Sequence, residues 1–517
     1  MKKLLALLLA LVMVLSIAAC GTSKPDPTQA PAKDDPKPTQ AAVQTDPPAE
    51  DPDDGEPYNV HILFRWTPPS EEGLQQVVDH INNNILPDLL PNTTISVQFV
   101  QNSEYVQTLK LYSANGTKVD LCSTFATYAF TDFVEQGAFL PLDDYLPYLS
   151  GTVGQMPEGW LDAVTIGGSP YAIPNYMGGA RAMCSCVDKE MIEKYNIDTT
   201  KIVDVESYEE LFCKVLKDNG EYAKGTIASG GTVNVWSDAQ AEVFTILGME
   251  QISEFLVVDS AEPTKIKWLT QSDGFLEGMN TLREWEEIGY TQNDLTGENW
   301  AACWEQNLVA SRNAALETDG SWDQKMKDTT NRDTYTFQMT EGVVTTNAIR
   351  ASMTALHYNS ENPYRAAKVL ELINTNEELC NALLYGVEGV HFTRDAEGKV
   401  ITNTECGYWV ASCSHIFGNQ LIRWAVSGTN PDTTWHEKNT TAKRGATFGF
   451  SFNGADVATE IASCKAIMDE YKQGFMNGKF EDVEGTIAEL NKKLEGAGLQ
   501  AIIDECQAQL DAWYASK

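Results

Sequence analysis

Short apolar runs of strand length alternate with stretches typical of helices along most of the chain. The runs typical of strands are residues 59–64, 95–100, 119–122, 308–315, 335–339 and 352–356. The stretches typical of helices are residues 71–85, 103–112, 207–218 and 275–288. Because strands that alternate with helices usually pair through helical crossovers, this pattern predicts an α/β fold with a parallel sheet covered by helices.

Capping signals mark two helices after the strand at 352–356. Asn362 followed by Pro363 is typical of an N-cap and a first helical residue, where the missing N–H of proline costs no hydrogen bond. Thr375 and Glu378 have the spacing of a capping box. We therefore expect one helix to start at Pro363 and a second to start after Thr375.

The loop after the second helix, residues 385–391, combines an aromatic ring, a carboxylate and an imidazole. Gly386 is placed to end the helix in a left-handed conformation. Glu388 could accept hydrogen bonds from two hydroxyl groups or could be an ordinary turn carboxylate, and we interpret His391 as a satisfied structural histidine. Polar residues on a loop held by rigid elements favour a binding loop.

The last part of the chain is predicted to contain a hairpin and two long helices. Residues 390–401 have the pattern of a hairpin that turns at 395–398. Residues 456–474 and 482–515 are amphipathic at helical spacing.

The amino terminus has the pattern of an exported protein. Residues 1–19 contain two lysines, an apolar core and small residues before a cysteine, and they are too short to remain as a membrane span. Residues 17–20, Ile-Ala-Ala-Cys, resemble the bacterial lipobox, which implies cleavage before Cys20 and acylation of its sulfur. An ordinary cleavage site is the alternative. Residues 20–56 are rich in Pro and Asp and are expected to form a disordered tether, with folding from residue 57.

Length and charge limit the possible functions. A chain of 517 residues exceeds one ordinary core, so we expect two lobes. The formal net charge of -36 argues against nucleic acid as a partner, because phosphates are bound by Lys and Arg.

The cysteines and the common catalytic motifs give little sign of a metal site or an enzyme. Ten of the eleven cysteines follow Cys20, and the pair Cys184 and Cys186 could in principle hold a metal from one strand face. We interpret them as structural thiols and expect no metal and no cofactor. Helical zinc motifs, nucleophile elbows and phosphate loops are missing from the sequence. A pair of catalytic carboxylates leaves no local spacing, so a secreted carbohydrate-active enzyme stays an alternative.

Several segments resemble bacterial extracellular solute-binding lipoproteins of ABC importers, family 1, in the LplA/LipO-like group. The matching segments are VDLCST at 119–124, the Leu-Pro-Leu-Asp stretch ending at 143, YGVEGVH at 385–391, GNQ at 418–420 and the C-terminal domain of unknown function. The resemblance implies a periplasmic-binding-protein-like fold of two α/β lobes with hinge crossings near residues 173 and 351. It assigns residues 57–173 and 351–388 to lobe 1, and residues 174–350 and 389–517, with the C-terminal helices, to lobe 2.

The resemblance also implies a function. We expect a lipid-anchored protein on the extracellular face of the cell membrane that captures a carbohydrate, in particular an oligosaccharide, and delivers it to ABC permease subunits without converting it. A peptide-binding or adhesion lipoprotein is the other alternative. The expected ligand contacts are aromatic platforms and polar groups at strand ends and crossings: Arg65, Trp66, Tyr128, Asn175, Tyr176, Arg181, Trp322, Glu388 and Trp409. Core packing of the rings and salt bridges of the arginines are the competing interpretations.

Overall fold

The computed structural model describes residues 52–53, 55–125, 130–221, 227–228, 241–292, 311–314, 323, 326–327, 330–403, 405–408, 410, 415–428, 434–476 and 478–517. All of them belong to one unit, Val43–Lys517. The expected acylation site Cys20 and three expected ligand contacts, Tyr128, Trp322 and Trp409, lie outside these ranges. Within them, no helix combines the length and the apolar character needed to cross a membrane.

The first sheet has the strand order β2-β1-β3-β17-β6. Its strands are β1 (Tyr58–Arg65), β2 (Thr93–Val100), β3 (Leu121–Thr124), β6 (Ile173–Pro174) and β17 (Met353–Leu356). β1 is parallel to β2 and β3, but β17 is antiparallel to both β3 and β6. The expected parallel sheet is therefore confirmed for β1, β2 and β3, and β17 is the exception. β17 enters the sheet from the other lobe and not from a helical crossover, so it runs in the opposite direction.

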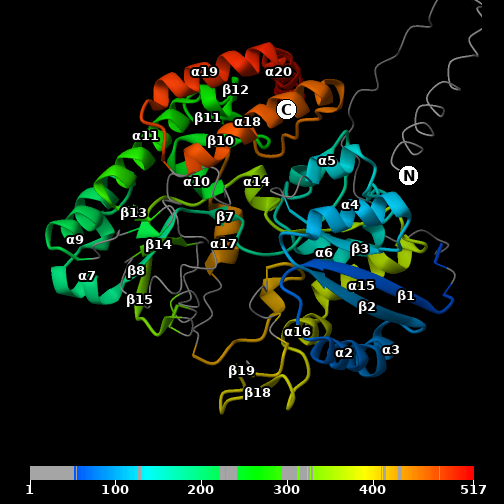
Figure 1. The fold of residues 1–517 in the computed structure, drawn as a ribbon. Helices are drawn as coiled ribbons and strands as arrows, with labels where there is room; N and C mark the ends of the chain where they lie inside the picture. Colours follow the sequence, from blue (N-terminus) through cyan, green and yellow to red (C-terminus); the bar gives the residue numbers. More distant parts are fainter. Residues whose placement is uncertain are drawn as a thin grey trace, which may run out of the picture. The chain divides into compact units, whose positions relative to one another are not determined.

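Helices from two distant parts of the chain belong to this first lobe (Figure 1). They are α2 (Glu71–His80), continued by a π-helical segment (Ile81–Ile85), α3 (Leu86–Leu89), α4 (Tyr105–Asn115), α5 (Phe130–Glu135), α6 (Ser150–Gln155), α15 (Pro363–Thr375) and α16 (Glu377–Tyr385). Helix α4 begins at Tyr105 with Glu104 at its N-cap, and not with the expected cap Ser103.

The capping signals of α15 and α16 are half confirmed. The side chain of Asn362 accepts a hydrogen bond from the Arg365 amide at 3.0 Å, as predicted for an N-cap. The cap of α16, however, is Asn376, which accepts from the Leu379 amide at 2.9 Å. The Thr375 hydroxyl instead donates to a carbonyl of the preceding turn, so the predicted capping box is wrong.

Residues 392–426 contribute to the core of the first lobe. This segment contains the hairpin β18 (Phe392–Arg394) and β19 (Val400–Thr402), which confirms the predicted hairpin. Phe392, Val400 and Phe417 are buried in one apolar cluster with the strands β1 and β2 and the helices α15 and α16. The assignment of everything after residue 388 to the second lobe is therefore wrong for this segment, because its apolar side chains are buried against the first sheet.

The second sheet has the order β13-β9-β14-β8-β15 and is also mixed. Its strands are β8 (Cys184–Asp188), β9 (Ile227–Ala228), β13 (Thr291–Gln292), β14 (Ser311–Ala314) and β15 (Thr334–Gln338). The neighbouring helices are α7 (Lys189–Tyr195), α8 (Val205–Tyr208), α9 (Lys214–Asp218), α10 (Ala241–Ile246) and α11 (Asp273–Ile288). A smaller antiparallel sheet follows α10: β10 (Met249–Gln251), β11 (Leu256–Asp259) and β12 (Ile266–Trp268).

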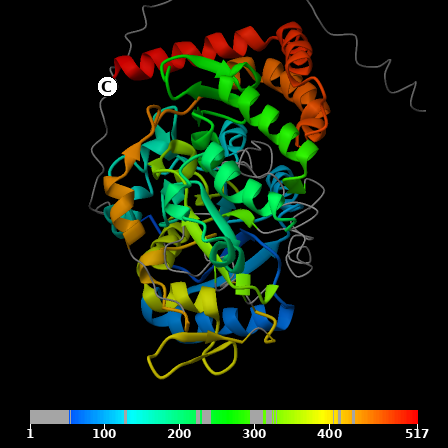
Figure 2. The same ribbon diagram turned by 90° about the vertical axis from the view of Figure 1, so that its left-hand side faces the viewer.

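Three C-terminal helices pack against this smaller sheet (Figures 1 and 2). They are α18 (Ala458–Met476), α19 (Val483–Gly496) and α20 (Leu499–Ala515). The expected single helix from 482 to 515 is broken at Gly498, whose φ of 102° lies in the left-handed region. A Cβ at this position would lie 2.6 Å from the Glu460 side chain, so both the turn and the approach of α18 favour glycine.

Three chain segments that connect the two lobes lie side by side. β6 pairs with β17, and β7 (Ala180–Arg181) pairs with β16 (Val343–Val344), in both cases antiparallel. β16 also pairs in parallel with β20 (Lys443–Arg444), which follows α17 (Thr434–Thr441). A short helix, α14 (Thr346–Ile349), lies between β16 and β17, and the hairpin of β4 (Thr165–Ile166) and β5 (Ser169–Pro170) precedes β6.

Candidate functional site

The carboxyl end of β1 holds two of the expected contacts. The guanidinium carbon of Arg65 lies 4.3 Å from the centroid of the Phe125 ring, at the end of β3. The next residue, Trp66, is half-buried, and its ring meets the His415 ring edge-on with centroids 5.6 Å apart. The strand ends therefore present a cation and an indole at the sheet edge where α/β proteins usually bind ligands.

Asn175, beside the first crossing, has an architectural role in this structure. It is almost fully buried, and its side-chain nitrogen donates to the Ser352 hydroxyl at 2.9 Å and to the His415 carbonyl at 3.4 Å. Its oxygen accepts from the Thr354 hydroxyl at 3.1 Å. Asn175 thus joins the first crossing, β17 and the loop that carries His415.

Tyr176 lies in an aromatic cluster at the crossings. Its ring stacks on Trp160 with centroids 5.3 Å apart and lies 5.8 Å from the Trp435 ring. Its hydroxyl is 2.5 Å from Nδ1 of His436, and burial raises the pKa of the phenol. With its ring buried and its hydroxyl engaged, Tyr176 holds its neighbours Trp160, Trp435 and His436 in place.

Arg181 and Glu388 do not join this group. Arg181 is buried in β7, and its guanidinium lies 3.9 Å from the sulfur of Met177. Glu388 is exposed and pairs with Arg394 at 3.1 Å, and the guanidinium of Arg394 lies 4.2 Å from the centroid of the Trp424 ring. The interpretation of Glu388 as an ordinary turn carboxylate fits this ion pair.

His391 fits its structural interpretation only in part. Its Nδ1 accepts a hydrogen bond from the Val387 amide at 3.0 Å, and burial lowers the pKa of the ring. Its buried Nε2 meets no hydrogen-bond partner among the described residues. Gly386 has a φ of 81°, as a helix-ending glycine should, although its ψ of -140° lies outside the left-handed helical region.

Helix α17 supplies further residues of the aromatic cluster at the crossings that no local sequence pattern indicated. Trp435 and His436 contact Tyr176, and Asn439 binds the backbone of the first crossing, accepting from the Gly179 amide at 2.7 Å. Residues 434–441 have no apolar pattern that distinguishes them from an ordinary surface helix. Only the third connection between the lobes, which brings α17 to the crossings, reveals them.

A buried cation lies at the second crossing. The Nε atom of Arg350 donates to the Ala163 carbonyl at 2.6 Å, and its Nη2 atom donates to the Ser451 hydroxyl. Burial lowers the pKa of Arg350 to about 10. Arg350 therefore fastens the first lobe to the segment after the third crossing by hydrogen bonds to neutral groups.

The half-buried rings are the parts of this group that a solute can touch. Trp66, His415 and Trp435 are each partly exposed, whereas Tyr176, which contacts Trp435, and Trp160 are buried. Flat apolar faces beside hydrogen-bonding groups suit the C–H face and the hydroxyl groups of a sugar ring. The arrangement therefore offers a surface that suits a sugar.

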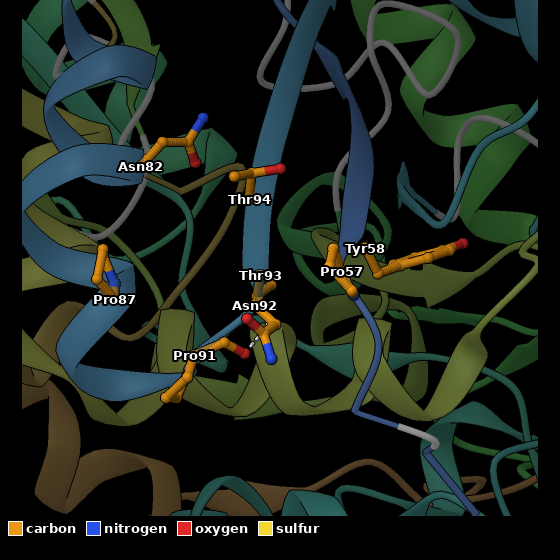
Figure 3. A pocket seen from close by; sticks show the side chains of 8 residues that line it. All are labelled: Pro57, Tyr58, Asn82, Pro87, Pro91, Asn92, Thr93 and Thr94. Carbon is orange, nitrogen blue, oxygen red and sulfur yellow. Dashed lines mark hydrogen bonds between the residues drawn. The ribbon is translucent and has the colours of Figure 1, made fainter.

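A separate depression of about 430 Å³ opens at the opposite, amino-terminal end of β1 and β2. Figure 3 shows Asn82 and Pro87 on helical turns at one side, Thr93 and Thr94 on β2 in the middle, and Tyr58 on the neighbouring strand. The depression lies at the start of β1, whereas Trp66 follows the last residue of that strand.

The cysteine pair in β8 gives no sign of a metal site. The sulfur of Cys184 lies 3.6 Å from the Ala182 carbonyl, and that of Cys186 lies 3.9 Å from the Asp323 carboxylate. Across the described part of the chain, no three His, Cys, Asp or Glu side chains are grouped to hold a metal. The described cysteines are buried, except for the half-buried Cys406.

Known proteins with similar sequences and folds are solute-binding proteins. A carbohydrate ABC transporter substrate-binding protein of Streptococcus pneumoniae serotype 4 is 23% identical over 437 residues, which cover 82% of this chain and 85% of that protein. The crystal structure of an N-glycan transport solute binding protein from Streptococcus pneumoniae has a TM-score of 0.72 at 20% identity, covering 88% of this chain and 98% of that one. The alginate-binding protein AlgQ2 without calcium ion has a TM-score of 0.58 at 15% identity, covering 88% and 98%.

Two family profiles match the chain. Residues 446–515 match a domain of unknown function, DUF3502, as the resemblance of the C-terminal helices predicted. Residues 70–378, more than half of the chain, match the bacterial extracellular solute-binding protein profile. The solute-binding family consists of non-enzymatic binding proteins, which confirms the expectation that this chain is not an enzyme. The chain thus belongs to the bacterial extracellular solute-binding protein family.

Proposed function

We propose that this protein captures a carbohydrate, specifically an oligosaccharide, outside the cell and delivers it to the permease of an ABC importer. The named relative that covers most of the chain is a carbohydrate ABC transporter substrate-binding protein. Solved structures with the same fold include complexes with Man5GlcNAc and with kestose. These similarities support the substrate class, and the individual contacts are argued from this chain.

The observation that carries the proposal is the group of half-buried rings beside the crossings, above all Trp66 at the end of β1. A sugar that covers one face of an indole buries about half of its ~150–250 Å². At about 25 cal/mol per Å² this contributes roughly 2–3 kcal/mol before losses. Trp66 and Trp435 together supply a useful share of the about 8 kcal/mol that corresponds to micromolar binding.

Capture requires contacts from both lobes. A ligand can favour a closed form only through interactions that the open form lacks. We infer that closure bends the three connections at β6–β17, β7–β16 and β20, which lie side by side between the lobes. Trp66 would meet the sugar from the first lobe, and Tyr128, which lies outside the described residues, is the other contact expected from that lobe. Trp322 remains the expected contact of the second lobe.

We also propose that Cys20 carries the lipid anchor. The lipobox-like Ile-Ala-Ala-Cys sequence and the Pro- and Asp-rich segment after it support acylation and tethering at the extracellular face of the cell membrane. Metabolic labelling with a fatty acid tests this directly. Label should enter the wild-type protein and be lost in Cys20→Ala, and equal labelling of both would contradict the anchor.

A melting-temperature screen with oligosaccharides tests the proposed substrate class. The protein without residues 1–20 should be stabilised by about 2.7 kcal/mol when a matching sugar is present at ~100 times its dissociation constant. Man5GlcNAc, Man1GlcNAc, kestose and alginate oligosaccharides form a suitable first panel. The bound sugar should be recovered unchanged by chromatography. Accumulation of cleaved product would instead favour a carbohydrate-active enzyme, and stabilisation by peptides but not by sugars would favour a peptide-binding lipoprotein.

A further inference from the structure

The structure places one residue of the expected tether inside the first lobe. Asp53 lies in the segment expected to be disordered, yet its side chain is only 2% exposed. Its Oδ2 accepts from Nε of Arg365 at 2.5 Å, and its Oδ1 accepts from Nη2 of the same guanidinium at 2.8 Å. This is the two-pronged geometry of the strongest arginine–carboxylate pairs. The expected start of the fold at residue 57 is therefore too late.

Further donors complete the pocket around the Asp53 carboxylate. Lys368, one turn after Arg365 in α15, donates to Oδ2 of Asp53 at 2.9 Å, and the side-chain nitrogen Nδ2 of Asn362 donates to Oδ1 at 3.0 Å. Asn362 is also the N-cap of α15, so the start of this helix and the tether residue are held by one side chain. The site is built from a helix N-terminus, two cations and an amide.

Arg365 depends on Asp53 for its charge balance. The arginine is 1% exposed, and its Nη1 donates to the Asn92 carbonyl at 3.2 Å and to the Thr93 hydroxyl at 2.8 Å. Both of these acceptors are neutral. A buried cation that loses its carboxylate partner is strongly unfavourable, so removal of Asp53 leaves Arg365 without compensation.

The attachment point lies at the far end of β1 from the candidate ligand site. Asn92 and Thr93 begin β2 at the edge of the depression in Figure 3, whereas Trp66 follows the last residue of β1. A strand of this length spans about 25 Å.

We propose that Asp53 clamps the tether to the amino-terminal edge of the first sheet. The anchor then holds the first lobe at the end opposite its ligand-contacting strand ends, and the second lobe is the one that moves on closure. The clamp itself needs no lipid, and only its role at the membrane rests on the proposed anchor at Cys20.

Hydrogen exchange followed by mass spectrometry tests the clamp on unacylated protein spanning residues 21–517. The variants are Asp53→Asn and, as the control, Asp88→Asn, which makes the same chemical change at an exposed carboxylate of α3 in the same lobe. In Asp53→Asn the amides of Gly55, Glu56 and Tyr58 should exchange at least about tenfold faster, while those of residues 62–64 in the centre of β1 stay protected. In the control both segments should match the wild type. Equal exchange in Asp53→Asn and the wild type would overturn the proposal.

The double variant Asp53→Asn/Arg365→Met keeps the test interpretable if the single variant is unstable. Removing both charges relieves the uncompensated cation, so the double variant should melt at a higher temperature than Asp53→Asn while the same three amides still exchange rapidly. A double variant that melts no higher than the single one would contradict the pairing. Because acylation plays no part in these measurements, their failure is distinct from a failure of the Cys20 labelling experiment.

Discussion

Single residues decide whether this protein can hold a sugar, and Trp66 is the first to test. Trp66→Ala should weaken binding of the sugar found in the melting screen by about 30- to 150-fold, since about 2–3 kcal/mol of ring burial is lost. Calorimetric titration measures this. The melting temperature of the unliganded protein should also fall, because the half-buried ring packs against the core of the first lobe, so the titration is done well below the melting temperature of the variant. Tyr358→Ala, which removes a ring 45% exposed just after β17, at the opposite end of the first sheet from Trp66, is the control. An equal loss in both variants would contradict a direct role for Trp66.

The Asp53 carboxyl gives a pH dependence with a defined sign. Burial alone would raise its pKa, but the hydrogen bonds from Arg365, Lys368 and Asn362 outweigh burial and hold the pKa well below its ordinary value. A lowered folded-state pKa adds stability above the unfolded pKa of about 4, and this stability is lost as the pH falls further. The difference in unfolding free energy between wild type and Asp53→Asn should be constant from pH 7 to about 5 and shrink below about 4. A difference that grows on acidification would show the opposite sign and exclude this explanation.

Gly386 tests the turn that ends α16. Its φ is 81°, and a Cβ would lie 2.7 Å from the His391 ring. Gly386→Ala should therefore cost about 2–4 kcal/mol in urea unfolding, from backbone strain and from the clash. Gly389→Ala is the matched control, since Gly389 has a φ of 82° but open space around its Cα. It should cost only about 1 kcal/mol. Equal costs would mean that the His391 contact is unimportant.

The positions of the candidate site residues were predictable from the sequence only where these residues follow a strand. Trp66 and Arg65 lie where the alternation of strands and helices placed them. Asn175 and Tyr176 lie at the expected crossing, but their side chains are buried in hydrogen bonds and stacked rings. No local pattern tells whether a polar residue at a crossing faces a solute or the protein, because that depends on partners more than 170 residues away, such as Ser352 and His436.

At the scale of elements, the N-cap of α16 can be tested by comparing Asn376, the observed cap, with Thr375, the cap that the sequence predicted. Asn376→Ala should destabilise the protein by about 1 kcal/mol, because the side chain caps the Leu379 amide. Thr375→Ala should cost less, since the Thr375 hydroxyl bonds a carbonyl that the helix already satisfies. Thermal unfolding of the two variants gives the comparison. A larger loss from Thr375→Ala would restore the capping box that the sequence suggested.

Most elements follow from local periodicity, and the exceptions have identifiable causes. The strand at 58–65, the helix at 363–375 and the hairpin at 392–402 lie close to their predicted bounds. The break at Gly498 was missed because the apolar pattern continues across it, while the close approach of Glu460 that favours glycine belongs to another helix. The direction of β17 was missed because strand direction is set by the route between lobes, which periodicity does not encode.

At the scale of the whole molecule, the assignment of segments to lobes depended on contacts far apart in the chain. Residues 392–426 read as polar loops and one hairpin, but their few large apolar side chains complete the core around β1 and α15. The third connection, through α17 and β20, places Trp435 against Tyr176 and could not be seen in any local pattern. The two-lobed plan itself was predictable from length and family resemblance.

The central claim is that one solute is held by both lobes beside their three connections. Hydrogen exchange with and without the sugar identified by melting tests it most directly. We predict slower exchange on binding at residues 65–66, at residues 176–181 and at residues 435–439, together with at least one segment of the second sheet, β8 or β15. Protection confined to one lobe, or protection only at the depression near Asn82 and Thr93, would contradict capture between the lobes.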